Sequence, residues 1–234
     1  MLYCDRHKFV YLNPPKTGNR SMLAMLKLHT ETKGFSISKE LKILRGGHIL
    51  YTDISDEQRH KISEYNRVIS VRNIYDRVYS AYGQFRRNIC KSKPGYVWSD
   101  PVLCQQDLSF KQVIERYLLS KEFLTNKVFH NFLPCHLYGN GNPVFFDTII
   151  YNETFEENVI QFFSQLGVSE ITVLHKNRAS DPIISDPFNM KWKDYRYLHN
   201  YDRTSVEIIN HVYKEDFECF GYAMLDPNEF PKIS

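Results

Sequence analysis

The stretch that decides the fold is residues 9–22, which read Phe-Val-Tyr-Leu-Asn-Pro-Pro-Lys-Thr-Gly-Asn-Arg-Ser-Met. The first four residues are apolar and predict a buried strand, which the two prolines end. A turn with Lys16 and Gly18 follows, and apolar residues then recur with helical spacing over residues 22–28. Strand, basic turn and helix in this order predict an anion site, because backbone N–H groups and the positive end of the helix dipole would face the ligand.

This turn differs from the phosphate loop of ordinary nucleotide-binding proteins. That loop reads Gly-x-x-x-x-Gly-Lys-[Ser/Thr], whereas here Lys16 precedes Gly18. The ordinary ATP or GTP interpretation is therefore excluded, a nucleoside kinase becomes unfavourable, and another phosphorylated ligand remains.

A second segment, residues 67–82, reads Arg-Val-Ile-Ser-Val-Arg-Asn-Ile-Tyr-Asp-Arg-Val-Tyr-Ser-Ala-Tyr. It again runs from an apolar strand, residues 68–71, into a helix. Arg72 stands at the carboxyl end of that strand, and Ser80 lies eight residues later, about two helical turns on. Parallel sheets bind ligands at the carboxyl ends of their strands, so both segments point to the same edge.

The remaining elements follow from apolar periodicity and turn residues. Ser55 is a plausible N-cap for a short helix. A further strand and four helices are predicted at residues 144–151, and at residues 108–119, 123–132, 154–166 and 203–214. Residues 88–107 and 178–200 read as long loops. Strands that alternate with helices predict an α/β fold, a single domain over residues 1–234 with a central parallel sheet flanked by helices and a P-loop-like anion loop.

Together the two segments resemble the sulfotransferases that use 3′-phosphoadenosine 5′-phosphosulfate (PAPS), and most closely their carbohydrate branch, similar to sulfotransferase family 2. That family carries Pro-Lys-x-Gly-x-x-Ser at its 5′-phosphosulfate loop and Arg-[Asn/Asp]-Pro-x-x-Arg-x-x-Ser-x-Tyr at its 3′-phosphate site. The matching residues here are Pro15, Lys16, Gly18 and Ser21, then Arg72, Asn73, Arg77, Ser80 and Tyr82. Ile74 replaces the proline of the second motif, which loosens the helix start but removes no phosphate ligand. Three later stretches, residues 147–155, 175–180 and 213–222, look like the family's later landmarks in the right order.

The resemblance implies a role for each matched residue. Sulfuryl transfer has a loose transition state, so it needs positioning and charge stabilisation rather than covalent catalysis. Lys16 is expected to stabilise the leaving oxygen. The cofactor-binding residues are expected to be Lys16, Thr17, Gly18, Asn19, Arg20 and Ser21 at the 5′-phosphosulfate, Arg72 and Ser80 at the 3′-phosphate, and Asn177 and Arg178 as a third piece near PAPS.

Several of these residues also have purely structural interpretations. Arg72 has a surface ion pair with Asp76 as its alternative, and Ser80 could be a buried helical serine. Arg77 and Asp76 are expected to form structural pairs. Glu153 either supports the site or caps a helix.

The acceptor hydroxyl needs a general base with a pKa near neutrality, for which histidine is the natural residue. His48, between two glycines and an apolar run, lies between the two phosphate segments, where the resembled family often places a His or Glu for this role. We therefore predict that His48 and Lys16 are catalytic. His136 and His175 are less favoured bases, and the carboxylates of the interval are the fallback: Glu40, Asp53 and Glu57.

Composition agrees with a globular enzyme. The chain has 234 residues, of which 42% are hydrophobic, and a net charge of +3, too small to imply nucleic-acid binding. No 18-residue apolar run or signal peptide is present, so we expect no integral membrane segment. A cytoplasmic enzyme is expected, or a soluble catalytic domain from which an anchor was removed; the oligomeric state stays open.

Neither cysteines nor histidines suggest a metal. The five cysteines form no Cys-x-x-Cys, and the nine histidines no metal-binding spacing. We predict no metal and five reduced thiols, with a disulfide between Cys90 and Cys104 as the less favoured alternative.

The acceptor is the least determined part. By resemblance, a carbohydrate or glycolipid hydroxyl comes first, and aromatic and basic loop residues would suit a glycan. A protein tyrosine, a small alcohol, or a binding protein that holds a 3′-phosphonucleotide without turnover are the alternatives. Lys16 argues against the last, since a binder has less need of a charge at the leaving oxygen.

Overall fold

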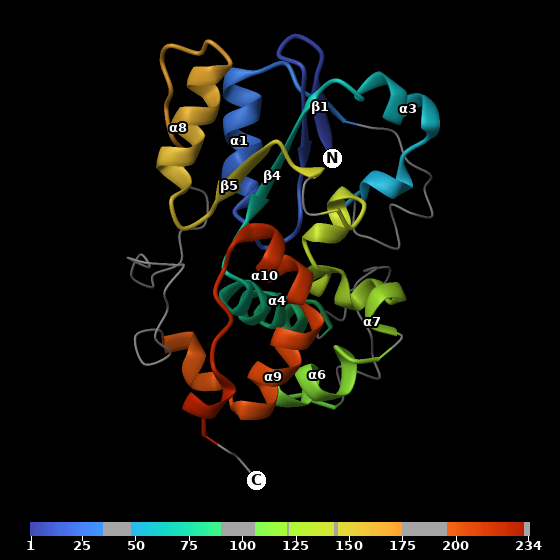
Figure 1. The fold of residues 1–234 in the computed structure, drawn as a ribbon, viewed down its shortest axis with the longest axis vertical. Helices are drawn as coiled ribbons and strands as arrows, with labels where there is room; N and C mark the ends of the chain where they lie inside the picture. Colours follow the sequence, from blue (N-terminus) through green and yellow to red (C-terminus); the bar gives the residue numbers. More distant parts are fainter. Residues whose placement is uncertain (35–47, 90–105, 121, 143–144, 175–195, 232–234) are drawn as a thin grey trace.

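The structure is a computed structural model that describes residues 1–34, 48–89, 106–120, 122–142, 145–174 and 196–231. Its centre is a five-stranded sheet in the order β3-β1-β2-β4-β5 (Figure 1). The strands are β1 (Leu2–Cys4), β2 (Phe9–Leu12), β3 (Lys33–Gly34), β4 (Asn66–Val71) and β5 (Thr148–Tyr151). The three strands β2, β4 and β5 are parallel, as the sequence predicts, and the α/β fold class is confirmed.

The sheet is mixed rather than wholly parallel, which corrects the predicted topology at one edge. Strand β1 pairs antiparallel with both β2 and β3. A turn at residues 5–8 joins β1 to β2, so the strand predicted as the first of the chain is the second. The sequence does not reveal these two edge strands because β1 has three residues and β3 has two. Strands this short show no recognisable alternation of apolar and polar side chains.

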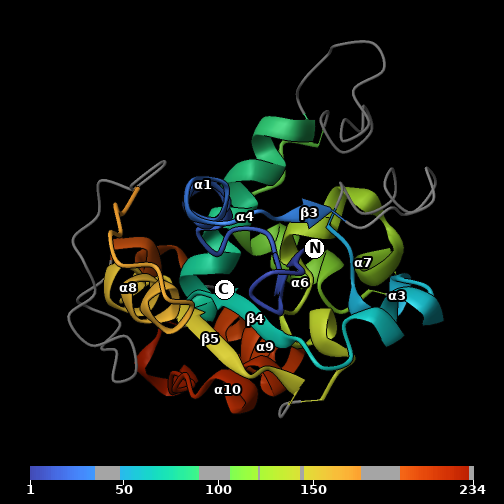
Figure 2. The same ribbon diagram turned by 90° about the horizontal axis from the view of Figure 1, so that it is seen from above.

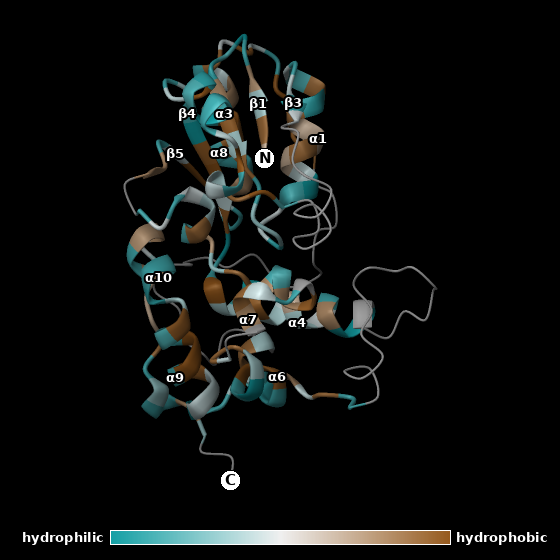
Figure 3. Ribbon diagram, turned by 90° about the vertical axis from the view of Figure 1, so that its right-hand side faces the viewer, coloured by the Kyte–Doolittle hydropathy of each residue, from teal (hydrophilic) through white to brown (hydrophobic). Residues whose placement is uncertain are grey.

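The central strands are buried because helices cover both faces of the sheet. All of Phe9–Leu12 and the last four residues of β4 are buried. Alternate side chains of β2 enter different clusters, with Phe9 and Tyr11 on the face covered by α1 (Asn19–His29) and α8 (Phe155–Gln165). In Figure 3, the hydrophobic colour is concentrated on the strands and on parts of the helices.

The other helices gather below the carboxyl edge of the sheet (Figure 1). They are α4 (Ile74–Ile89), α6 (Phe110–Tyr117), α7 (Glu122–Thr125), α9 (Arg203–Val212) and α10 (Lys214–Phe220), while α3 (Asp56–Lys61) lies beside the sheet. Short 3-10 helices span Tyr51–Asp53, Lys127–Phe132, His136–Gly139, Arg196–Asn200 and Pro227–Glu229. Seen from above, α1 lies over the course of α4 (Figure 2). The start of α1 therefore faces α4, which brings the two phosphate segments together.

Several predicted boundaries shift for local reasons. Ser55 caps α3 as predicted, accepting a hydrogen bond from the backbone of Gln58. The helix predicted over residues 123–132 is instead α7 and a 3-10 helix, because the side chain of Asn126 accepts a bond from Val128 N and starts a new element. The helix predicted over 203–214 ends at Val212, and α10 follows. Of the predicted strand 144–151, β5 covers Thr148–Tyr151, and residue 144 lies outside the described residues.

The expected loops fall largely outside the described residues. This holds for most of residues 88–107, with Cys90 and Cys104, and for residues 178–195 of the second loop. The last five residues of that second loop, Arg196–Asn200, form a 3-10 helix rather than irregular chain.

Candidate active site

The loop between β2 and α1 has a left-handed backbone at two positions. Lys16 has φ 69° and Gly18 has φ 83°. Asn19 closes the loop from inside, donating from Nδ2 to the carbonyl oxygens of Asn13, at 3.1 Å, and Pro14. The hydroxyl of Thr17 donates to the same Pro14 oxygen at 2.8 Å. The side chains of Thr17 and Asn19 therefore hold the loop in shape. These two residues can contact a ligand through their backbone N–H groups.

Gly18 starts α1 and no side-chain hydrogen bond caps that helix. Its carbonyl accepts bonds from the backbone of Ser21 at 2.9 Å and Met22 at 3.2 Å. The first N–H groups of an α-helix lack intrahelical partners and carry the positive end of its dipole. Arg20 is exposed beside them and the Ser21 side chain is buried under them. The start of α1 thus has the features of an anion site.

Asn152, which is not one of the site residues predicted from the sequence, packs over this loop. It directly follows β5, and its backbone donates to Val71 O of β4 at 2.9 Å. A Cβ at Gly18 would lie 2.5 Å from Asn152 Oδ1, so only glycine leaves room for the carboxamide. Strand pairing thereby fixes the end of β5 against the anion loop.

Lys16 lies within a group of cations. The pKa of Lys16 falls to about 8, first because the side chain is largely buried, and then because of the positive charges of Arg87, Arg72 and Arg20. The negative charge of Asp76 opposes this fall. Four cations from the loop, α1, the end of β4 and α4 thus act on one region, which suits a highly charged anionic ligand.

Arg87 belongs to this group, although it lies outside the sequence motifs selected above. A Cβ at Gly83 would lie 3.7 Å from Arg87 Nη1, so the guanidinium folds back along α4 over Gly83. It also donates to Gln84 Oε1 at 3.3 Å. Asp76, Ser80 and Arg87 recur at intervals of four and seven residues, which places them along one side of α4. That helical spacing is the signal that could have identified Arg87.

Arg72 follows β4 and pairs with Asp76 in the first turn of α4. Arg72 Nε and Nη2 lie 2.6 Å and 2.5 Å from Asp76 Oδ2, and each side chain is 18% exposed. The ion pair that was the structural alternative for Arg72 is therefore present, half-buried rather than on the surface. Ser80 is half-buried one turn further on, and its hydroxyl makes no hydrogen bond to any described residue.

His48 lies against the other end of the loop. Its Nδ1 donates to Asn13 O at 2.8 Å, since a carbonyl oxygen can only accept. This bond leaves Nε2 of a neutral imidazole unprotonated, as a base requires. Burial, and secondly the neighbouring His130, lower the pKa of His48 to about 4, well below the near-neutral value expected of the base from the sequence. The two imidazole rings stack with their centroids 5.7 Å apart.

The other base candidates are engaged or exposed. His136 Nδ1 bonds to Asp216 Oδ1 at 2.8 Å, deep in the helical layer. Asp53 Oδ2 accepts from Leu50 N at 2.9 Å, and Glu57 is exposed on α3. Glu40 and His175 lie outside the described residues. So do Asn177 and Arg178, the predicted third piece of the cofactor site.

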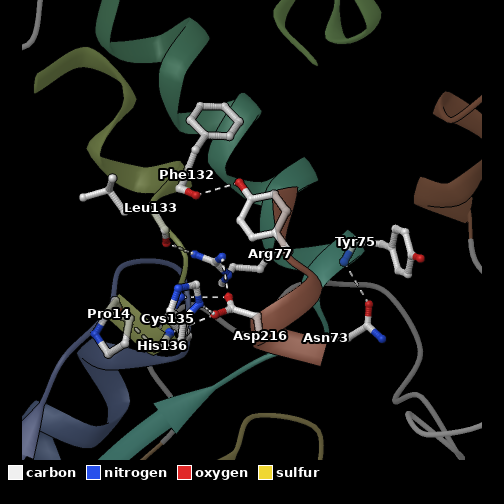
Figure 4. Close-up of polar contacts among 11 residues, drawn as sticks. Pro14, Asn73, Tyr75, Arg77, Phe132, Leu133, Cys135, His136 and Asp216 are labelled. Atoms are coloured by element: carbon white, nitrogen blue, oxygen red, sulfur yellow. Dashed lines mark hydrogen bonds and ion pairs between the residues drawn. The ribbon is translucent and has the colours of Figure 1, made fainter. Parts of the chain in front are cut away.

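A buried ion pair anchors α4 beneath the site (Figure 4). Arg77 is fully buried and donates to Leu133 O at 2.9 Å and to Asp216 Oδ2 at 3.3 Å. Asp216, from α10, also accepts from the backbone of Cys135 and His136, each at 2.8 Å. The predicted structural pairing of Arg77 is thus present, with a partner 139 residues away.

Glu153 links the residues that follow two strands to the C-terminal part of the chain. It accepts from Asn73 N at 2.6 Å and from the Tyr222 hydroxyl at 2.8 Å, while the residue before α8 is Thr154. Burial raises the pKa of Glu153. Of its two interpretations, support of the chain around Arg72 fits these bonds.

Within the described residues, no group of three or more His, Cys, Asp or Glu side chains could hold a metal ion. No helix among them is both long and apolar enough to cross a membrane.

A family model described as "Sulfotransferase family" matches residues 1–223. No curated protein and no solved structure matches the chain.

Proposed function

Because this chain belongs to the sulfotransferase family, we propose that its sulfonate donor is PAPS and that its acceptor is a carbohydrate or glycolipid hydroxyl. Membership of the family supports sulfuryl transfer from a donor to an acceptor in general. The choice of PAPS as donor rests chiefly on one observation, the group of cations around Lys16 at the carboxyl ends of β2 and β4. The choice of acceptor rests on the resemblance to the carbohydrate branch.

The fit to PAPS can be argued from the charges and the free donors. The 5′-phosphosulfate needs donors at a helix start, which the uncapped first turn of α1 offers. A 3′-phosphate is what separates PAPS from ATP-like nucleotides, and Arg72 and Ser80 are the residues we assign to it. Asn177 and Arg178 remain proposed as further contacts.

In this proposal the acceptor oxygen forms a bond to sulfur while the bond from sulfur to the bridging phosphate oxygen breaks. Protonated Lys16 stabilises the negative charge that develops on that oxygen, an interaction that grows toward the transition state. The acceptor proton passes to Nε2 of His48, whose Nδ1 is held by Asn13 O. Thr17 and Asn19 keep the loop in shape, so that its N–H groups do not need to reorganise during the reaction.

Calorimetry with nucleotides tests the donor. The protein should bind 3′,5′-adenosine diphosphate (PAP) much more tightly than 5′-AMP or ATP, since each charge-assisted contact to a phosphate contributes about 1.5–3 kcal/mol. Equal affinity for ATP and PAP would exclude PAPS as the donor.

A transfer screen with radiolabelled PAPS tests the acceptor. Glycans, glycolipids, tyrosine peptides and small alcohols are offered in parallel. Label on the first two supports the proposal, and label only on peptides or small alcohols replaces its acceptor. Tight PAP binding without transfer to any of them would indicate a binding protein.

A further inference from the structure

The contact between Arg72 and Asp76 uses one edge of a planar cation. Both short contacts, 2.6 Å from Nε and 2.5 Å from Nη2, end on the same oxygen, Asp76 Oδ2. A guanidinium carries five N–H donors in a rigid fork. With the Nε edge held by Asp76, the terminal Nη1 end stays available, and Arg72 has no second partner among the described residues.

The surroundings of Asp76 suit a role in orientation. Glu153 is the other carboxylate close by, and its two oxygens are occupied by Asn73 N and the Tyr222 hydroxyl. Asp76 is thus the carboxylate that contacts the guanidinium, and it lies on a helix that Arg77 and Asp216 anchor in the core. Because this helix is fixed, Asp76 can hold the guanidinium of Arg72 in one direction. Without such a contact, the four rotatable bonds of the arginine side chain would let the guanidinium take many directions.

We propose that Asp76 is a positioning residue, which holds Arg72 side-on so that the free end of the guanidinium takes the 3′-phosphate of the donor. This inference rests on the proposed use of PAPS. Two other effects of Asp76 would act differently. A negative charge beside the phosphate would repel it, and an acidic residue in the first turn of α4 would stabilise the helix through its dipole.

The measured quantity is the preference for PAP over 5′-AMP, given as the ratio of their dissociation constants. Asp76→Ala removes the oxygen that holds Arg72, and this ratio should fall about tenfold, the order of one charge-assisted hydrogen bond. Asp76→Asn keeps a carbonyl oxygen that can accept both contacts but removes the charge. Its ratio should equal or exceed that of the wild type.

The alternatives give other patterns. If Asp76 only repels phosphate, both substitutions should raise the ratio. If it only stabilises the helix, both should lower the melting temperature and leave the ratio unchanged. An Asp76→Ala ratio at or above the wild-type value would therefore overturn the inference. Should that variant not fold, Asp76→Ser carries the same expectation, because its hydroxyl is too short to reach Arg72.

Two controls isolate the pair. In an Arg72→Ala background, Asp76→Ala should have no further effect on the ratio, since no guanidinium remains to be oriented. Glu207→Ala breaks a pair of the same spacing, with Arg203 on α9 at 3.0 Å, and should leave the ratio unchanged. In turnover, Asp76→Ala should raise KM for PAPS and preserve kcat. A wild-type protein with no preference for PAP would refute the proposed donor instead, so the two failures are distinguishable.

Discussion

Asn152 Oδ1 occupies the space that a side chain at Gly18 would need. A Cβ there would lie 2.5 Å from this oxygen, closer than carbon and oxygen atoms approach without a shift. Gly18 starts α1 and Asn152 follows β5, far away in the sequence, so their contact holds the anion loop against the parallel part of the sheet.

Gly18→Ala should therefore weaken PAP binding at least tenfold. The substitution forces Asn152 away and also strains a backbone with φ 83°. Gly167→Ala is the matched control, because its φ is 78° but nothing lies within 4 Å of the new Cβ. That control should lose about 1–2 kcal/mol of stability and bind PAP normally. Equal effects of the two substitutions on PAP binding, measured by calorimetry, would mean that Asn152 does not matter.

From the lowered pKa of Lys16 we predict that activity is lost in mild alkali. Its pKa is lowered to about 8, so its positive charge disappears as the pH rises through that value. The value of kcat/KM for PAPS reports the free enzyme and should fall above pH 8. Lys16→Ala should lower turnover while preserving PAP binding. Lys16→Arg, where it retains activity, should lack the alkaline fall, because arginine stays charged; a fall that persists there would belong to another group.

From the lowered pKa of His48 we predict that the acidic limb of the pH–rate profile lies at unusually low pH. A base must be neutral, and the pKa of His48 is lowered to about 4, so protonation should reduce kcat/KM only near that pH. A pH–rate profile that is flat between 5 and 7 is expected. His48→Ala should lower turnover roughly 10²–10⁴-fold and leave PAP binding nearly normal. His60→Ala, at an exposed histidine of α3, is the control; near-normal turnover of His48→Ala would move the base to a carboxylate.

We predict that substitution of Asp216 causes a large loss of stability. Asp216→Asn leaves the fully buried Arg77 without its counter-charge, and such a change costs about 3–5 kcal/mol. Glu218→Gln, on the same helix, breaks an exposed pair with Lys214 and should cost about 0.5 kcal/mol or less. Urea unfolding compares the two. A similar small loss for both would show that the pair with Arg77 contributes little.

Much of the fold could be predicted because it depends on local patterns. The apolar runs before Pro14 and Arg72 are long enough to reveal β2 and β4, and their carboxyl ends identify the edge where the loops meet. The family resemblance depends on the same two loops together with three later stretches, and it is confirmed over residues 1–223. The roles assigned to Lys16, His48, Arg72 and Ser80 stay predictions.

The rest depends on contacts between residues distant in the chain. That Arg77 would pair was expected, but Asp216 as its partner depends on how α10 packs against α4, which no local pattern encodes. Asn152 reaches Gly18 only because β5 pairs with β4. The edge strand β1 could not be predicted for a different, local reason. Its three residues are too few to show the alternation that identifies a strand.

Helix α4 serves two surfaces at once, with the buried Arg77 toward the core and Ser80 on the side of Asp76, which contacts Arg72. One residue inserted between them would turn everything beyond it by about 100°. Arg77 and Ser80 could then no longer both keep their present positions on the helix surface. In the evolution of this chain, the composition of α4 can therefore drift by substitution, whereas the spacing along its first two turns cannot change by insertion or deletion without loss of the core contact or the site.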